Sequence, residues 1–141
     1  YAKPGHACRH NLNYWQFGDY LGIGAGAHSK LSFHDRILRQ MRVKHPQQYM
    51  DAMRTRTHIA DTRTLTRADL PFEFMMNALR LNQGVPAALF EERTGLPLAA
   101  CATALEKART RGLLDADPVW LRPTLLGQKF LNDLLERFLA A

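Results

Sequence analysis

The second half of the chain spaces its apolar residues at helical intervals and interrupts them with glycines, and this pattern constrains the fold most. A first helix is predicted to begin after Asp69, which suits an N-cap, and to end at Gly84. Further helices are predicted over residues 86–94, before Gly95, and over residues 98–111, before Gly112. Their apolar faces are Phe72, Met75, Met76 and Leu79 on the first helix, Leu89 and Phe90 on the second, and Leu98, Cys101, Ala102 and Leu105 on the third.

A short hairpin and a final helix are predicted to follow. Residues 113–114 and 119–122 flank the turn Asp115-Ala116-Asp117-Pro118, whose residue types favour a reversal of the chain. Thr124 suits the N-cap of a last helix with a broad apolar face. This order of elements is typical of a winged helix. The core predicted for it is Phe72, Met76, Leu79, Leu89, Leu105, Leu121, Phe130 and Leu134.

The charges divide the chain near Leu65. Residues 1–65 contain ten Lys and Arg, four Asp and no Glu, whereas residues 66–141 contain nine basic and nine acidic residues, so the net charge of +6 lies in the first half. A winged helix can bind DNA through its third helix, here with Lys107, Arg109 and Arg111. Because duplex binding depends on neutralising phosphates, the balanced second half makes nucleic acid an unlikely partner and favours a structural or protein-docking use.

The first half is predicted to mix strands with a helix. Residues 20–27 are typical of a strand that leads into a Gly-rich turn, and residues 30–43 are typical of a hairpin around His34-Asp35. Within it, Ile37, Met41 and Val43 suggest one buried face. Pro46 is expected to open a short helix through Met53, and residues 57–65 to form an extended linker. Since this half has few core residues of its own, we expect its strands to pair with a larger sheet.

The stretch His10-Asn11-Leu12-Asn13-Tyr14-Trp15 is the most informative for function. Imidazole is the commonest protein ligand of haem iron, and flat aromatic rings beside it can cover a porphyrin. Lys3 and Arg9, with His6 nearby, would suit haem propionates. On residue chemistry alone, a histidine packed in an ordinary loop is the simpler interpretation.

The resemblance to a known family changes that balance. HNLNYW over residues 10–15 resembles the HNxxYW motif associated with haem binding in HemW-type haem chaperones. Residues 20–29, YLGIGAGAHS, resemble a stretch near the end of the barrel in oxygen-independent coproporphyrinogen III oxidase-like proteins. Residues 57–84 resemble the start of the HemW C-terminal domain. Together these segments cover nearly the whole chain in the expected order.

The resemblance implies a radical-SAM protein of which this chain, which opens at Tyr1 without an initiator Met, is the C-terminal part. The expected fold class is α+β: residues 1–65 as terminal strands and helix of a partial barrel with a linker, and residues 66–141 as a winged-helix-like domain. The resemblance implies a 4Fe-4S cluster held by a CxxxCxxC segment, with S-adenosylmethionine as a further ligand of the cluster. That segment is absent here, since Cys8 and Cys101 are the chain's two cysteines.

The resemblance also implies a function and a site. The chain is expected to bind haem and to deliver it to acceptor haemoproteins in the cytoplasm, as a chaperone more than as an enzyme. The site residues carried over are His10 as axial iron ligand, Tyr14 and Trp15 as ring contacts, and Asn11 as a positioning group. No apolar run reaches the ~18 residues that cross a bilayer. The alternative functions are a coproporphyrinogen III oxidase-type enzyme and a winged-helix module that binds nucleic acid. Separately, the exposed strand edges are expected to favour self-association of the chain.

Overall fold

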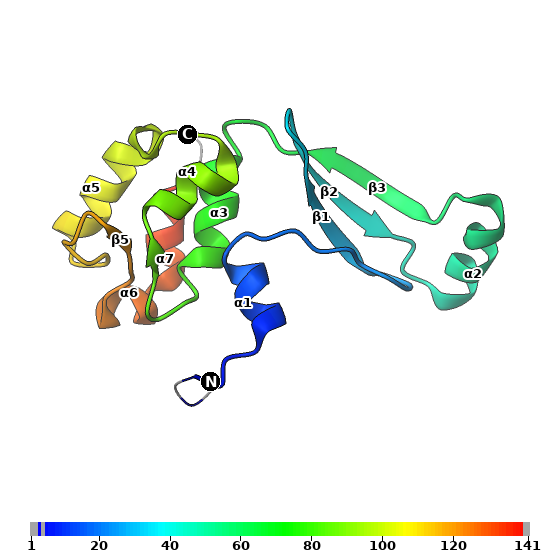
Figure 1. Ribbon diagram of the computed structural model, residues 1–141, viewed down its shortest axis with the longest axis horizontal. Helices are drawn as coiled ribbons and strands as arrows, with labels where there is room; N and C mark the ends of the chain where they lie inside the picture. The colour runs from blue at the N-terminus through cyan, green and yellow to red at the C-terminus, as the bar shows by residue number, and fades with distance from the viewer. Residues whose placement is uncertain (1–2, 4, 140–141) are drawn as a thin grey trace. The chain divides into compact units, whose positions relative to one another are not determined.

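The computed structural model describes residue 3 and residues 5–139, and they form two compact units. One unit joins the segment up to Gly18 with the segment from Arg67 onward, and the other consists of residues 19–66. Figure 1 shows the helices of the first unit and the sheet of the second. The assignment of residues 1–65 to the end of a barrel concerns a longer protein and stays a prediction.

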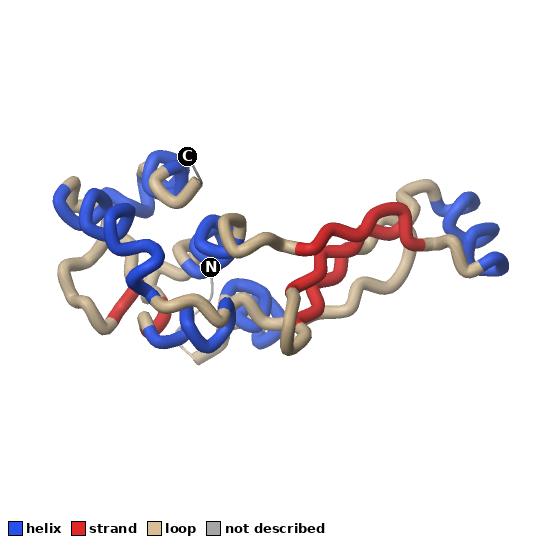
Figure 2. The backbone as a smooth tube through the Cα atoms, turned by 90° about the horizontal axis from the view of Figure 1, so that it is seen from above, coloured by secondary structure: helices blue, strands red, loops and turns tan. Residues whose placement is uncertain are grey.

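The unit of residues 19–66 is a three-stranded antiparallel sheet with one helix, drawn as red strands and a blue helix in Figure 2. Its strands β1 (His28–Ser32), β2 (Ile37–Arg42) and β3 (Ile59–Thr64) are hydrogen-bonded in the order β1-β2-β3. Helix α2 (Pro46–Thr55) lies between β2 and β3 in the chain. The predicted hairpin around His34-Asp35 and the helix that Pro46 opens are both confirmed.

Two expectations for this unit were wrong. Residues 57–65 are not a linker, because β3 pairs with β2 over Ile59–Thr64. The side chains of β3 are exposed along its whole length, so the strand has none of the alternation that reveals a half-buried strand. Residues 20–27 are not a strand either, since only Tyr20 forms an isolated bridge, with Lys30. Backbone and side-chain hydrogen bonds hold this segment: the Gly26 N–H donates to the Val43 carbonyl at 2.8 Å, and the Arg42 guanidinium donates to the Gly22 carbonyl at 2.6 Å.

Gly22 shows why this segment is rich in glycine. A Cβ placed on it would overlap the backbone of His28, so the loop can approach β1 only without a side chain there. The Gly22 N–H donates to the Ser29 hydroxyl at 2.9 Å, which fixes the same approach. Gly26 adopts a positive φ of 70°, a conformation that favours glycine. The glycines therefore serve close backbone packing and a turn.

The other unit is mostly helical. It contains α1 (Arg9–Trp15), α3 (Leu70–Ala78), α4 (Ala88–Thr94), the 3₁₀ helix η1 (Leu98–Cys101), α5 (Ala102–Thr110), α6 (Leu125–Lys129) and α7 (Leu131–Glu136). Two short strands, β4 (Val85–Pro86) and β5 (Trp120–Leu121), pair antiparallel. Gly95 ends α4 with a φ of 68°, and the Thr124 hydroxyl caps α6 by accepting from the Gly127 N–H, as the sequence predicted. Among the described residues, no helix is long and apolar enough to cross a membrane.

The predicted core needs correction at four positions. Leu79, Leu105, Leu121 and Leu134 are buried, but Phe72, Met76 and Leu89 are only partly buried and Phe130 is 44% exposed. Helix α3 buries Leu70, Phe74, Met75 and Ala78, a face rotated from the predicted one. The final helix is broken at Phe130, whose φ of −113° and ψ of 48° separate α6 from α7 and turn its ring outward. On α5, Ala102 is exposed and Ala108 is buried instead.

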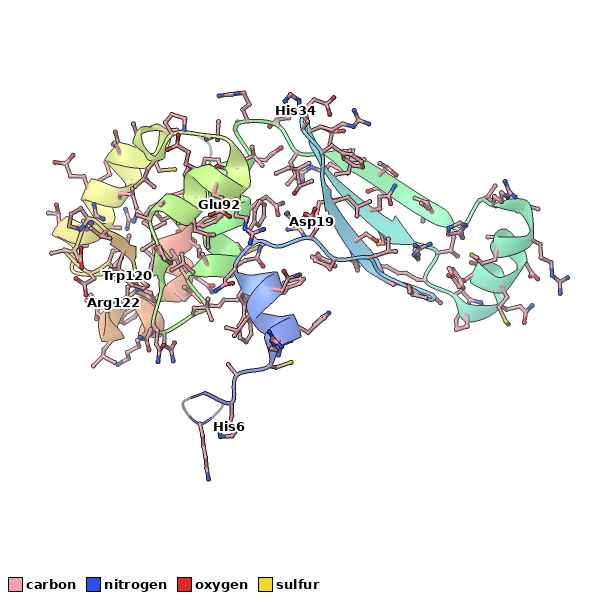
Figure 3. The ribbon with its side chains drawn as sticks, viewed as in Figure 1. His6, Asp19, His34, Glu92, Trp120 and Arg122 are labelled. Atoms are coloured by element: carbon pink, nitrogen blue, oxygen red, sulfur yellow. The ribbon has the colours of Figure 1, made fainter. Side chains whose placement is uncertain are left out.

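The segment between α5 and α6 forms the predicted reversal of the chain. Leu114 bridges Pro123, and the Asp115 N–H donates to the Arg122 carbonyl at 2.9 Å. The Arg122 guanidinium meets the Asp115 carboxylate at 2.7 Å, and Figure 3 shows Arg122 beside Trp120 of β5 (Figure 3). Two hydrogen bonds lower the pKa of the Asp115 carboxyl: the stronger effect comes from the backbone N–H of Asp117, and the next from the Arg122 guanidinium. These contacts close the turn.

Candidate functional site

The candidate site begins with α1, which contains all four residues implied by the resemblance. The segment is a helix, not the packed loop of the simpler interpretation. No residue of α1 is fully buried, although the helix contacts α3 and its Leu12 and Trp15 are partly buried. Phe17, two residues beyond it, is 1% exposed and meets the Phe74 ring edge-on, with centroids 5.7 Å apart. Phe74 in turn meets Phe90 at 5.2 Å, so α1 is anchored to the core by an aromatic chain.

A tight turn connects α1 to this anchor. Phe17 has a φ of 59°, which is strained for a residue with a side chain. The Gly18 N–H donates to the Asn13 carbonyl at 2.8 Å, and a Cβ on Gly18 would overlap the Asn13 side chain. The turn thus has room only for glycine at residue 18, and burial of the Phe17 ring offsets the backbone strain.

The four candidate residues occupy two faces of α1. Asn11 and Trp15 are four positions apart and therefore share one face, and His10 and Tyr14 share another in the same way. His10 and Asn11 are exposed, Tyr14 is 37% exposed, and Trp15 is partly buried. One flat ligand on one face of the helix would therefore meet two of these residues more readily than all four.

A groove opens on the face of Asn11 and Trp15. It has a volume of about 540 Å³ and is lined by His6, Ala7, Cys8, Asn11, Leu12, Trp15, Arg80, Leu81 and Asn82. We call it the α1 groove. Its lining brings Asn11 and Trp15 together but does not include His10 or Tyr14. The volume falls within the range of small-molecule pockets.

Three side chains with useful chemistry line the α1 groove but are not among the site residues predicted from the sequence. His6 and Cys8 bring an imidazole and a thiol, both of which ligate haem iron; Figure 3 shows His6 on the segment before α1 (Figure 3). Arg80 follows α3, and its Nε donates to the Met76 carbonyl at 3.1 Å. The spacing along the chain gave no signal for Arg80, because 65 or more positions separate it from α1 and only packing unites them.

A second polar cluster lies in the unit of residues 19–66. Lys30 is only 1% exposed, and its ammonium group donates to the Asp19 carboxylate and to the Ser32 hydroxyl, both at 3.0 Å. Partial burial opposes ionisation of Asp19. Hydrogen bonds from the Ser32 hydroxyl and backbone N–H and from Lys30 outweigh it and lower the pKa of the carboxyl. The cluster ties the chain at Asp19 to β1 and is internally satisfied, so we assign it a structural role.

Metal sites built from grouped side chains do not occur in the described part of the chain, where no three His, Cys, Asp or Glu residues lie close enough to hold an ion. Cys101 is 4% exposed, and burial raises the pKa of its thiol to about 11. Such a thiol stays protonated near neutral pH and is a poor ligand. Cys8 is exposed at the α1 groove, so it is the cysteine available to a ligand.

The fold and the site can now be set beside known proteins. Residues 65–130 match the family model of the HemN C-terminal domain. The solved structure of coproporphyrinogen III oxidase, HemN, from Escherichia coli, a radical SAM enzyme, matches with a TM-score of 0.58. The two sequences are 21% identical over 86% of this chain and 28% of that one. At this identity the match shows a shared fold, and it supports the expected mixture of helices and strands.

The curated relatives are more specific. Heme chaperone HemW of Escherichia coli K12 is 44% identical over 141 residues, which is 99% of this chain and 36% of the relative. Heme chaperone HemW of Haemophilus influenzae is 41% identical over 140 residues, again 99% of this chain and 36% of the relative. The chain thus spans about a third of the length of these relatives. This similarity over nearly the whole chain confirms the resemblance to HemW-type proteins found in its sequence.

Proposed function

We propose that the chain is the C-terminal part of a haem chaperone that binds haem and delivers it to acceptor haemoproteins in the cytoplasm. The observation that carries this proposal is the 44% identity over the whole chain to a protein named heme chaperone. The α1 groove supports it, because an apolar wall with Trp15 and nearby metal-ligating groups suits an iron porphyrin. In this proposal haem is the cargo of the protein.

The finer fold belongs to the same proposal. We propose that residues 1–65 end a radical-SAM barrel and that residues 66–141 are a winged helix. Strand β4 lies between α3 and α4 in the chain and pairs with β5, an arrangement that suits a winged helix. In the longer protein, cysteines that this chain does not contain would hold a 4Fe-4S cluster, and S-adenosylmethionine would bind to that cluster.

The proposed roles of the site residues follow from the motif. The resemblance implies His10 as the axial ligand of the iron, Tyr14 and Trp15 as contacts of the porphyrin ring, and Asn11 as a positioning amide. His10 is exposed, so an iron porphyrin can reach it. His6 and Cys8 are the alternative ligands on the face of the α1 groove.

The test is haem titration of the full-length protein and of its His10→Ala, His6→Ala and Cys8→Ala variants. Loss of an axial ligand shifts or abolishes the Soret band, so the ligand is the residue whose replacement does so. His34→Ala is the matched control, because His34 is an exposed histidine on the β1–β2 turn. A wild-type protein without a haem-dependent Soret band refutes the proposal. An unchanged band in His10→Ala removes the role implied for His10.

The two alternatives are separated by other measurements. An enzyme of the coproporphyrinogen III oxidase type would convert porphyrinogen substrate when its cluster is reconstituted, and a chaperone would not. Nucleic-acid binding by residues 66–141 would give a gel shift at modest salt. Of the three basic residues considered for DNA binding, Arg109 already has a partner within the protein, because its Nε donates to the Asp115 carbonyl at 3.2 Å.

A further inference from the structure

The α1 groove has the chemistry of a site for a flat, apolar carboxylate. Leu12, Trp15 and Leu81 supply apolar surface, and no Asp or Glu is among its lining residues. Arg80 supplies a positive charge. A tetrapyrrole such as haem is a flat apolar ring that carries two propionate groups at one edge. Its ring and its acidic edge therefore need different partners, and the groove offers both kinds.

The geometry of Arg80 favours a carboxylate partner. Its Nε–H is already used by the Met76 carbonyl at 3.1 Å, which holds the guanidinium at the C-terminal end of α3. Arg80 forms no ion pair with another described residue. Its terminal NH₂ groups are therefore left for a ligand in the groove. A guanidinium presents such N–H groups as a planar fork that matches a carboxylate.

We propose that Arg80 binds a propionate of the tetrapyrrole in the α1 groove, with the ring lying against Trp15. This inference rests on the proposed function and extends it, since it assigns the acidic edge of the cargo to a loop that the HNLNYW segment does not include. It makes Arg80 a binding residue that selects porphyrins with free carboxylates. The iron ligand is a separate matter, because a guanidinium does not bind iron.

The experiment compares haem with haem dimethyl ester, in which both propionates are esterified and uncharged. Dissociation constants are measured in the full-length protein for wild type, Arg80→Ala and Arg80→Lys. Because charged hydrogen bonds contribute about 1.5–3 kcal/mol, we expect Arg80→Ala to weaken haem binding roughly tenfold or more. The ester should bind wild type and Arg80→Ala within about twofold of each other, since it offers no carboxylate. Arg80→Lys should recover part of the loss, because a lysine keeps the charge without the fork.

Controls separate this inference from the proposed function. Arg111→Ala removes an exposed arginine that is not among the groove's lining residues, and it should leave haem affinity unchanged. The Soret maximum should stay at its wild-type position in Arg80→Ala, whereas loss of an iron ligand would move it. An equal loss for haem and its ester, or no loss for either, overturns the role of Arg80 while the chaperone proposal stands. A wild type that binds neither compound overturns both.

Discussion

Replacing Phe17 with alanine tests the anchor that positions α1. The ring is 1% exposed and meets Phe74 edge-on at 5.7 Å. Truncation of a buried phenylalanine costs about 3–5 kcal/mol, a figure that includes the cavity left behind. The strain of the positive φ at residue 17 does not offset this, because alanine keeps a Cβ and suffers the same strain. We therefore expect a loss of roughly 3–5 kcal/mol in the free energy of unfolding.

The assay is urea denaturation of this chain followed by circular dichroism, with the midpoint and slope compared between variants. Phe130→Ala is the matched control, because this ring is 44% exposed and its loss should cost no more than about 1 kcal/mol. The sequence pattern alone assigned Phe130 to the core, so the pair also tests the corrected packing. Equal costs for the two variants, or a cost for Phe17→Ala below about 1 kcal/mol, would refute the anchor.

Four further predictions concern other parts of the molecule. The pKa of Asp19 is lower in the folded chain than its ordinary value near 4, so its carboxylate stabilises the fold fully above about pH 4 and stops doing so as the pH falls through the folded-state pKa. Asp19→Asn should therefore make the free energy of unfolding less dependent on acid pH in pH-jump denaturation. An acid profile identical to that of the wild type would contradict this. Maleimide at pH 8 should label Cys8 and spare Cys101, whose pKa is about 11; mass spectrometry that finds both labelled in the native state would count against the structure. Gly127→Ala should destabilise the chain by about 1–3 kcal/mol despite alanine's higher helix propensity, because its Cβ would overlap the Leu113 carbonyl; a higher melting temperature would disprove this. Because β1 and β3 are the sheet edges, sedimentation should detect self-association at high concentration, and a clean monomer would argue against it.

The sequence by itself determined the elements that local chemistry controls. Gly95 ends α4 because glycine readily adopts a positive φ. Thr124 caps α6 because its hydroxyl can accept from a free N–H of the first turn. Pro46 opens α2 because the first turn needs no N–H from it. The HNLNYW segment, together with residues 20–29 and 57–84, indicated the resemblance to HemW-type proteins through its residues alone. Each of these signals lies within a few positions of the feature that it predicts.

Only the tertiary structure decided which residues meet across the chain. The sequence predicts a linker where β3 forms, because the strand's side chains are exposed and show no alternation, and only its pairing with β2 reveals it. The apolar pattern predicts a continuous final helix, but the backbone breaks at Phe130, whose ring is 44% exposed. At the candidate site, the sequence supplied Asn11 and Trp15 but gave no reason to add Arg80. Local propensity fixes the backbone of a segment, whereas burial and contacts between distant segments depend on packing, which no spacing along the chain encodes.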